Sequence, residues 1–234
     1  MLLAGAHAST PDLGNECATC HLRRAWTRSV TTHVDLWVTS RHAFYRVGCE
    51  KCHGGDPSTS DEQTAHRGVV QSADPSSPVH RTALPMTCGR CHRAEATAFA
   101  QSAHRAALSR GDPAAPTCTS CHTSMATEVP SLTALEKQCR DCHRVDPQNR
   151  AQVARRQLEE STRLRTGLRT AKLEIDMTKN AERRASLTQQ WVDADRSLRD
   201  VIAGIHAFDQ HHVDERLTEA RAQVDRLRAE IARR

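Results

Sequence analysis

The sequence predicts a mainly α-helical fold in two parts, and three observations support this prediction. Residues 9–146 are interrupted by clusters of Gly, Pro and Asp, as at 54–57 and 111–113, which favour short helices joined by loops. Residues 147–234 are rich in Ala, Leu, Arg, Glu and Gln, which favour long helices. All ten cysteines fall in the first part, in pairs of fixed spacing.

The first eight residues have the features of a secretory leader. Residues 1–8 read Met-Leu-Leu-Ala-Gly-Ala-His-Ala, which resembles the end of a signal peptide with an Ala-x-Ala cleavage site. An ordinary N-terminal segment is the alternative. No stretch approaches the roughly eighteen apolar residues needed to cross a bilayer, so we expect no transmembrane span.

Five copies of the frame Cys-x-x-Cys-His account for every cysteine. The cysteines are Cys17 and Cys20, Cys49 and Cys52, Cys88 and Cys91, Cys118 and Cys121, and Cys139 and Cys142, and the histidines are His21, His53, His92, His122 and His143. This frame attaches c-type haem: the two thiols bond to the porphyrin vinyl groups and the histidine binds the iron. The sequence therefore predicts five covalently bound haems c.

Other uses of paired cysteines fit less well. Zinc sites and redox dithiols do not require a histidine directly after the second cysteine. A disulfide framework would need pairs that link distant loops, whereas these pairs are tight. The frames therefore favour haem over all three alternatives.

The first part is also poor in Leu, Ile and Phe, too poor to bury an ordinary hydrophobic core. We expect the five porphyrins to form its interior, so residues 9–146 should fold only with haem. Because covalent haem is attached outside the cytoplasm, we expect a periplasmic or extracellular protein. The net charge of +5 does not indicate nucleic-acid binding, since the basic residues are interspersed with acids and haem propionates offset them.

The second part is expected to form a helical hairpin. Asp146 and Pro147 have the residue types of a helix N-cap and first position, and no proline follows. Apolar residues recur at intervals of three and four, from Leu187 to Ile231. With a break at 178–180, we expect two helices, about 148–177 and 182–232, that pack on the haems and offer a surface for a partner or a second copy of the chain.

Histidine is unusually frequent, at 14 of 234 residues, and nine copies lie outside the frames. His42 and His104 share the pattern aromatic-x-x-Ser-x-His, His66 follows a turn-rich stretch after the second frame, and His206 lies on the second long helix. These four are candidates for the second axial ligand of a haem iron, in a bis-histidine arrangement. The fifth haem could use another side chain or remain open. The candidates are His33, His80, His211, His212 and Met125.

These motifs resemble those of the multihaem cytochrome c superfamily, which includes pentahaem nitrite reductases, octahaem hydroxylamine oxidoreductases and small tetrahaem electron carriers. The similar elements are Ser-x-His at His42 and His104, Cys-His-Gly-Gly-Asp at 52–56 followed by Ala-His at His66, and Gly-x-His at His206. The resemblance implies that these histidines are distal haem ligands. It also implies that the helical tail packs against the haems and often builds a dimer.

The sequence lacks two features that enzymes of this superfamily have. Nitrite reductases attach their catalytic haem through a frame that ends in lysine, and none of the five frames does. Hydroxylamine oxidoreductases need a tyrosine near the C-terminus, whereas the single tyrosine is Tyr45. Three residues after His122, where relatives often have histidine, stands Met125, which could bind iron or simply pack.

We therefore expect an electron carrier rather than an enzyme. Its haems would relay electrons between redox-partner proteins, such as a membrane quinol oxidase and a terminal reductase. Two alternatives remain open. One is a small reductase or oxidase of nitrogen compounds with one five-coordinate haem, and the other is an electron-conducting subunit of a larger assembly.

Overall fold

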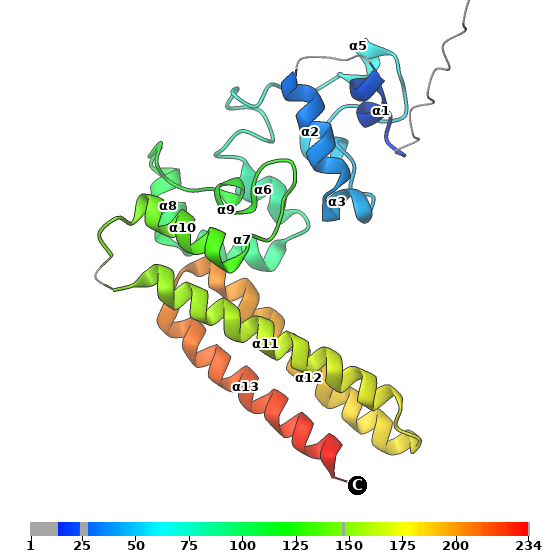
Figure 1. Cartoon of the computed structure of the whole chain (residues 1–234). Coiled ribbons are helices and arrows are strands. Elements are labelled where there is room, and N and C mark those ends of the chain that lie inside the picture. The colour runs from blue at the N-terminus through cyan, green and yellow to red at the C-terminus, as the bar shows by residue number, and fades with distance from the viewer. Residues whose placement is uncertain (1–13, 24–27, 147, 234) are drawn as a thin grey trace, which may run out of the picture. The chain divides into compact units, whose positions relative to one another are not determined.

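The computed structural model describes residues 14–23, 28–146 and 148–233, and these residues form helices and loops with no strand among them (Figure 1). The prediction of a mainly α fold is therefore confirmed. The expected leader at 1–8, together with His7, lies outside the described residues.

Two compact units divide the chain, and each is built from separate stretches. The first unit comprises the described residues up to Cys88 together with Pro116–Val129, and the second comprises Gly89–Ala115 and Pro130–Arg234. This division does not coincide with the expected domain boundary at 146–147, because residues 89–115 and 130–146 group with the long helices.

The first unit consists of short helices and loops. Its helices are α1 (Glu16–Arg23), α2 (Arg28–Val38), α3 (Arg41–Phe44), α4 (Glu50–His53), α5 (Glu62–Ala65), α9 (Cys118–His122) and α6 (Leu84–Gly89), the last of which ends at the division. Among its described residues, the buried apolar side chains are Ala18, Val34, Trp37 and Ala126. Such a small core agrees with the expectation that this stretch cannot fold around its own aliphatic side chains.

The second unit begins with three shorter helices, α7 (Arg93–Ala100), α8 (Ala103–Ser109) and α10 (Leu132–Cys142). Phe99, Leu108 and Ala115 form a small buried cluster there. Within this unit α7 contacts α12 (Ala181–Gly204), and α10 contacts α11 (Arg150–Asp176). The helices next to the third and fifth cysteine frames therefore pack against the long C-terminal helices.

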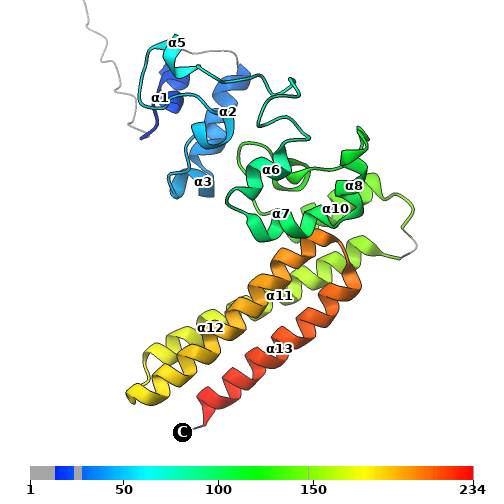
Figure 2. The ribbon, with the colours of Figure 1, turned by 180° about the vertical axis from the view of Figure 1, so that it is seen from behind.

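The C-terminal region is a bundle of three helices, α11, α12 and α13 (Gln210–Ala232), each packed on the other two (Figures 1 and 2). The expected break at 178–180 is confirmed, since Asn180 caps α12 by accepting a hydrogen bond from the Arg183 amide at 2.8 Å. The start of α11 differs slightly from the expectation. Asn149 is its N-cap residue, while the Asp146 carboxylate accepts a hydrogen bond from the Ala151 amide at 3.3 Å.

The expected two-helix hairpin is wrong, because the predicted helix 182–232 is broken at 205–209. A short 3-10 turn, η1 (Ile205–Ala207), follows α12, and Phe208 then adopts the left-handed conformation with φ 57°. Asp209 starts α13 as its N-cap, with its carboxylate accepting from the His212 amide at 3.1 Å.

Folding α13 back has an energetic reason. It buries the apolar faces of all three helices against one another, which two helices alone could not do. The shared core consists of Leu164, Leu168, Ala171, Ile175, Leu187, Ala194, Leu198, Val201, Val213, Leu217, Ala220, Val224 and Leu227.

Candidate functional site

Four of the five cysteine frames form a helical turn. The first and fourth lie within α1 and α9, the second opens α4, and the fifth closes α10. The His53 amide donates to the Cys49 carbonyl at 2.9 Å and the His143 amide to the Cys139 carbonyl at 2.8 Å, as in an α-helix. Residues i, i+3 and i+4 of a helix share one face. Each of these frames therefore presents its two thiols and its imidazole on one side.

The third frame is built differently. Cys88 lies in α6, which ends at Gly89, and His92 is the N-cap residue of α7. This frame therefore joins two helices instead of forming one turn.

None of the ten cysteines forms a disulfide, and none is fully buried. The thiols of different frames come close to each other in two places. Cys88 and Cys118 form a hydrogen bond that, with burial, raises the pKa of Cys88. Burial first, and then the nearby Cys17 and Glu50, raise the pKa of Cys49 to about 12. The thiols of the first and second frames, and of the third and fourth, are thus neighbours in space.

Two of the frame histidines, His21 and His143, each lie beside a histidine that the sequence predicts as a distal ligand. The rings of His21 and His66 have centroids 5.9 Å apart and planes inclined by 19°. The rings of His104 and His143 also have centroids 5.9 Å apart, with an interplanar angle of 44°. These pairs belong to the first and fifth frames, and each lies within a single unit.

The second frame has a histidine neighbour as well. Burial first, and then His33 and His21, lower the pKa of His53. His33 is one of the side chains predicted as an alternative ligand, and the structure brings it near the second frame.

The fourth frame lies close to His42. Thr127 Oγ1 is 2.9 Å from His42 Nδ1, and the next residue, Glu128, has its carbonyl oxygen 3.1 Å from His122 Nδ1. A two-residue segment thus contacts both histidines. Sequence analysis did not identify Thr127, because its partner lies far away in the chain.

The third frame is connected through α7 to the turn that contains His206. The helix α7 begins directly after His92 and packs on η1, which contains His206.

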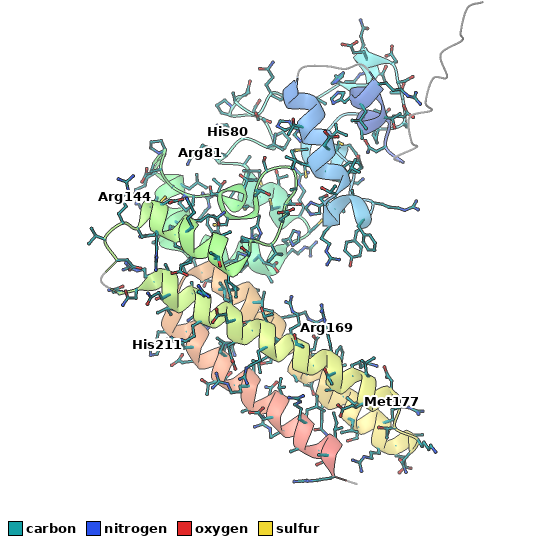
Figure 3. All side chains as sticks on the ribbon, viewed as in Figure 1. His80, Arg81, Arg144, Arg169, Met177 and His211 are labelled. Carbon is teal, nitrogen blue, oxygen red and sulfur yellow. The ribbon has the colours of Figure 1, made fainter. Side chains whose placement is uncertain are left out.

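The other candidates are engaged elsewhere. His80 Nδ1 lies 2.8 Å from Thr82 Oγ1 in the loop before α6, and His211 at the start of α13 has an 86% exposed side chain near Glu215 (both histidines are labelled in Figure 3). His212 also lies beside Glu215. Met125 packs against the cluster of Ala18, Val34 and Trp37, which fits the packing role that sequence analysis left open.

Hydrogen bonds set the tautomer of several candidate histidines. The Nδ1 atoms of His66, His122 and His206 lie 2.9, 3.1 and 3.1 Å from the carbonyl oxygens of Glu62, Glu128 and Ala203. Since a carbonyl only accepts, Nδ1 carries the proton and Nε2 has the lone pair that a metal needs.

Burial favours the neutral, metal-binding form of other histidines. It is the largest cause lowering the pKa of His21 and of His104, and the facing His66 and His143 lower these pKa values further. His104 differs from the hydrogen-bonded histidines, because its Nδ1 is buried without a hydrogen-bond partner.

The described residues contain no group of three or more His, Cys, Asp and Glu side chains that could hold a metal ion by themselves. A haem iron needs only two protein ligands, because the porphyrin supplies the other four. In the same part of the chain, no helix is long and apolar enough to span a bilayer.

Comparison with known proteins gives no relative. The chain matches no protein-family model, no curated protein and no solved structure. The features of this chain that indicate a function are therefore the five frames and the histidines around them.

Proposed function

We propose that the protein is a pentahaem c-type cytochrome that relays electrons between redox-partner proteins in the periplasm or outside the cell. The observation that carries this proposal is the pairing of His21 with His66 and of His143 with His104, with ring centroids 5.9 Å apart in both pairs. An iron held between two imidazoles needs centroids about 6 Å apart, from two metal–nitrogen bonds of about 2 Å and about 1 Å from each nitrogen to its ring centre.

The residues present fit the haem group in two further ways. The first unit has a very small core of its own, which leaves the interior to be supplied by an apolar group. Large apolar side chains are also exposed next to the histidines. Met86 is 70% exposed two residues before Cys88, and Val145 is 87% exposed two residues after His143. A porphyrin edge would cover such side chains.

The proposed axial pairs follow from these neighbours. His21 pairs with His66, His53 with His33, His92 with His206, His122 with His42, and His143 with His104. His80, which was also predicted as a ligand, is not needed in this scheme.

The haem supplies reversible one-electron chemistry when it is bound, and the chain supplies attachment, ligation and shielding. Two histidines per iron leave no position for a substrate, which favours electron relay over catalysis. The close approach of the thiols of the first and second frames, and of the third and fourth, supports short distances between the groups they attach.

The position of this protein in the cell follows from the same chemistry. A covalently attached haem implies maturation outside the cytoplasm. The partners would be a membrane quinol oxidase as donor and a terminal reductase as acceptor. Homo-oligomerisation through the C-terminal helices stays a prediction, and the bundle does not require it, because its three helices bury their apolar faces internally.

Spectroscopy of the oxidised holoprotein tests the proposal. We expect a pyridine haemochrome assay to give five haems c per chain and the EPR spectrum to contain only low-spin ferric iron. Addition of nitrite or hydroxylamine should leave the spectrum unchanged. A high-spin signal that shifts with either compound would instead support a catalytic haem.

A further inference from the structure

The turn between η1 and α13 contains an aromatic residue in an unfavourable conformation. Phe208 has φ 57° and ψ 22°, in the left-handed region, which Gly or Asn usually occupies at a helix C-terminus. A bulky side chain is rare there, and such outliers gather at functional sites. The Phe208 side chain is also 46% exposed, so core burial does not account for its presence.

The Phe208 ring contacts a proposed haem ligand. Its centroid lies 4.4 Å from that of the His104 imidazole, with an interplanar angle of 73°, an edge-to-face contact. His104 in turn faces His143 of the fifth frame. All three residues belong to the second unit.

His104 is held differently from the other proposed distal ligands. His66 and His206 direct Nδ1 to a backbone carbonyl, at 2.9 and 3.1 Å. The Nδ1 atom of His104 is buried and has no acceptor. A second-shell acceptor both fixes a ligand imidazole and makes it more basic. The His104 ring has the phenyl contact in place of that hydrogen bond.

We propose that Phe208 is a positioning residue for the axial ligand His104, and that it keeps the fifth haem at a higher reduction potential than the haems bound by His66 and His206. The proposal rests on the pentahaem function above. A less basic imidazole stabilises ferric iron less, so the reduced state is favoured. Electrons entering the chain of haems would then collect at the fifth haem.

Two substitutions of Phe208 in the full holoprotein test this inference. Phe208→Asn suits the left-handed conformation and replaces the phenyl group beside His104 with a polar side chain that can accept a hydrogen bond. Phe208→Leu keeps an apolar side chain there but removes the aromatic ring. We expect both variants to shift the g-values of one low-spin EPR signal. The potential of the same haem should fall in Phe208→Asn, and fall less in Phe208→Leu.

Two control variants separate an effect on the fifth haem from a general effect on the protein. His104→Ala identifies the signal of the fifth haem by converting it to high spin. Met177→Asn, at the exposed C-cap of α11, should leave all five signals and potentials unchanged. The inference is overturned if both Phe208 variants keep five haems with wild-type signals and potentials, or if only the melting temperature changes. A wild-type haem content below five would instead contradict the proposed function.

Discussion

The imidazole pairs His21–His66 and His104–His143 have ring centroids 5.9 Å apart, a separation at which one metal ion fits between two ring nitrogens. Two such neighbours would repel when protonated, and burial already disfavours the charged form of His21 and His104. In the proposed holoprotein, an iron atom would take one lone pair from each ring of a pair. The proposed haem-binding function therefore depends on these individual histidines.

Removing one distal histidine should change the spin state of one haem. We expect His66→Ala and His104→Ala each to convert one of the five haems from low spin to high spin, because a single axial position is vacated. EPR and visible absorption spectra of the oxidised variants measure this. His80→Ala is the matched control and should keep the wild-type spectrum, since His80 lies outside the proposed axial pairs. Fully low-spin spectra of both ligand variants would contradict the assignment.

The sequence predicts the candidate ligands but not their pairing. The frames fix ten cysteines and five histidines by spacing alone, and the local patterns point to His42, His66, His104 and His206. Which histidine faces which frame depends on contacts between residues far apart in the chain, such as Thr127 with His42. Phe208 gave no signal, because its left-handed conformation results from the turn that the folded bundle imposes.

Among the elements, α11 and α13 are joined by a buried polar side chain. Gln157 is 2% exposed, and its Nε2 donates to the Gln210 carbonyl at 2.8 Å and to Asp214 Oδ1 at 3.1 Å. Gln210 is the first residue of α13, where the chain has just turned back. This side chain therefore fixes the position at which the third helix begins.

Gln157→Leu should destabilise the bundle. The substitution removes the two hydrogen bonds that Gln157 donates to Gln210 and Asp214, at a cost of roughly 1–3 kcal/mol in the free energy of unfolding. Denaturant titration followed by far-UV circular dichroism measures the loss. Gln189→Leu, on the exposed side of α12, should change stability by less than about 0.5 kcal/mol. Equal effects of the two substitutions would show that Gln157 has no special role.

The bundle also contains an ion pair that predicts a pH dependence. Glu160, whose side chain is 15% exposed, accepts hydrogen bonds from Arg163 and Arg221 at 2.7 Å. Its pKa is lowered, first by the bond from Arg163 and then by that from Arg221, while burial opposes the shift. A carboxyl whose pKa is lower in the folded state stabilises that state above the unfolded pKa of about 4.3, and this stability disappears as the pH falls through the folded value.

Glu160→Gln should therefore flatten the acid side of the stability profile. We expect the melting temperature of the wild type to fall further than that of the variant between pH 7 and about pH 3, because only the wild type loses the carboxylate. The comparison is made by thermal melts at fixed ionic strength. Glu219→Gln, at a 62% exposed pair with Arg216, should follow the wild-type profile. Parallel profiles for Glu160→Gln and the wild type would refute the prediction.

The helix boundaries predicted from the sequence agree with the structure where nearby residues strongly favour a helix end. The α11–α12 break at 178–180 was found from composition, and Asn180 caps the second helix there. The break at 205–209 was missed because apolar residues continue at helical spacing on both sides of it, from Val201 to Leu217. Asp209 was an available N-cap signal, but only the burial of three apolar faces together makes the turn favourable.

At the scale of the whole molecule, the two units differ in the interactions that stabilise each of them internally. The bundle of α11, α12 and α13 has a continuous aliphatic core, whereas the described part of the first unit buries very few apolar side chains. The bundle should therefore be stable by itself, and the first unit should depend on its cofactors.

Production of the full chain without haem attachment tests this difference. We expect hydrogen exchange to be slow in 150–232 and fast in 28–88, because only the bundle retains a core. Mass-spectrometric hydrogen exchange resolves the two regions, and the mature holoprotein serves as control, with protection in both. Strong protection of 28–88 in the haem-free chain would contradict the proposed role of haem as the interior.

The central claim is that this chain carries five covalently bound haems. Intact-mass spectrometry of the mature protein, purified under denaturing conditions from a host that attaches haem c, tests it most directly. The account predicts one species with the mass of the mature chain plus five haems. A bare chain, or a dominant species with fewer than five haems, would contradict it.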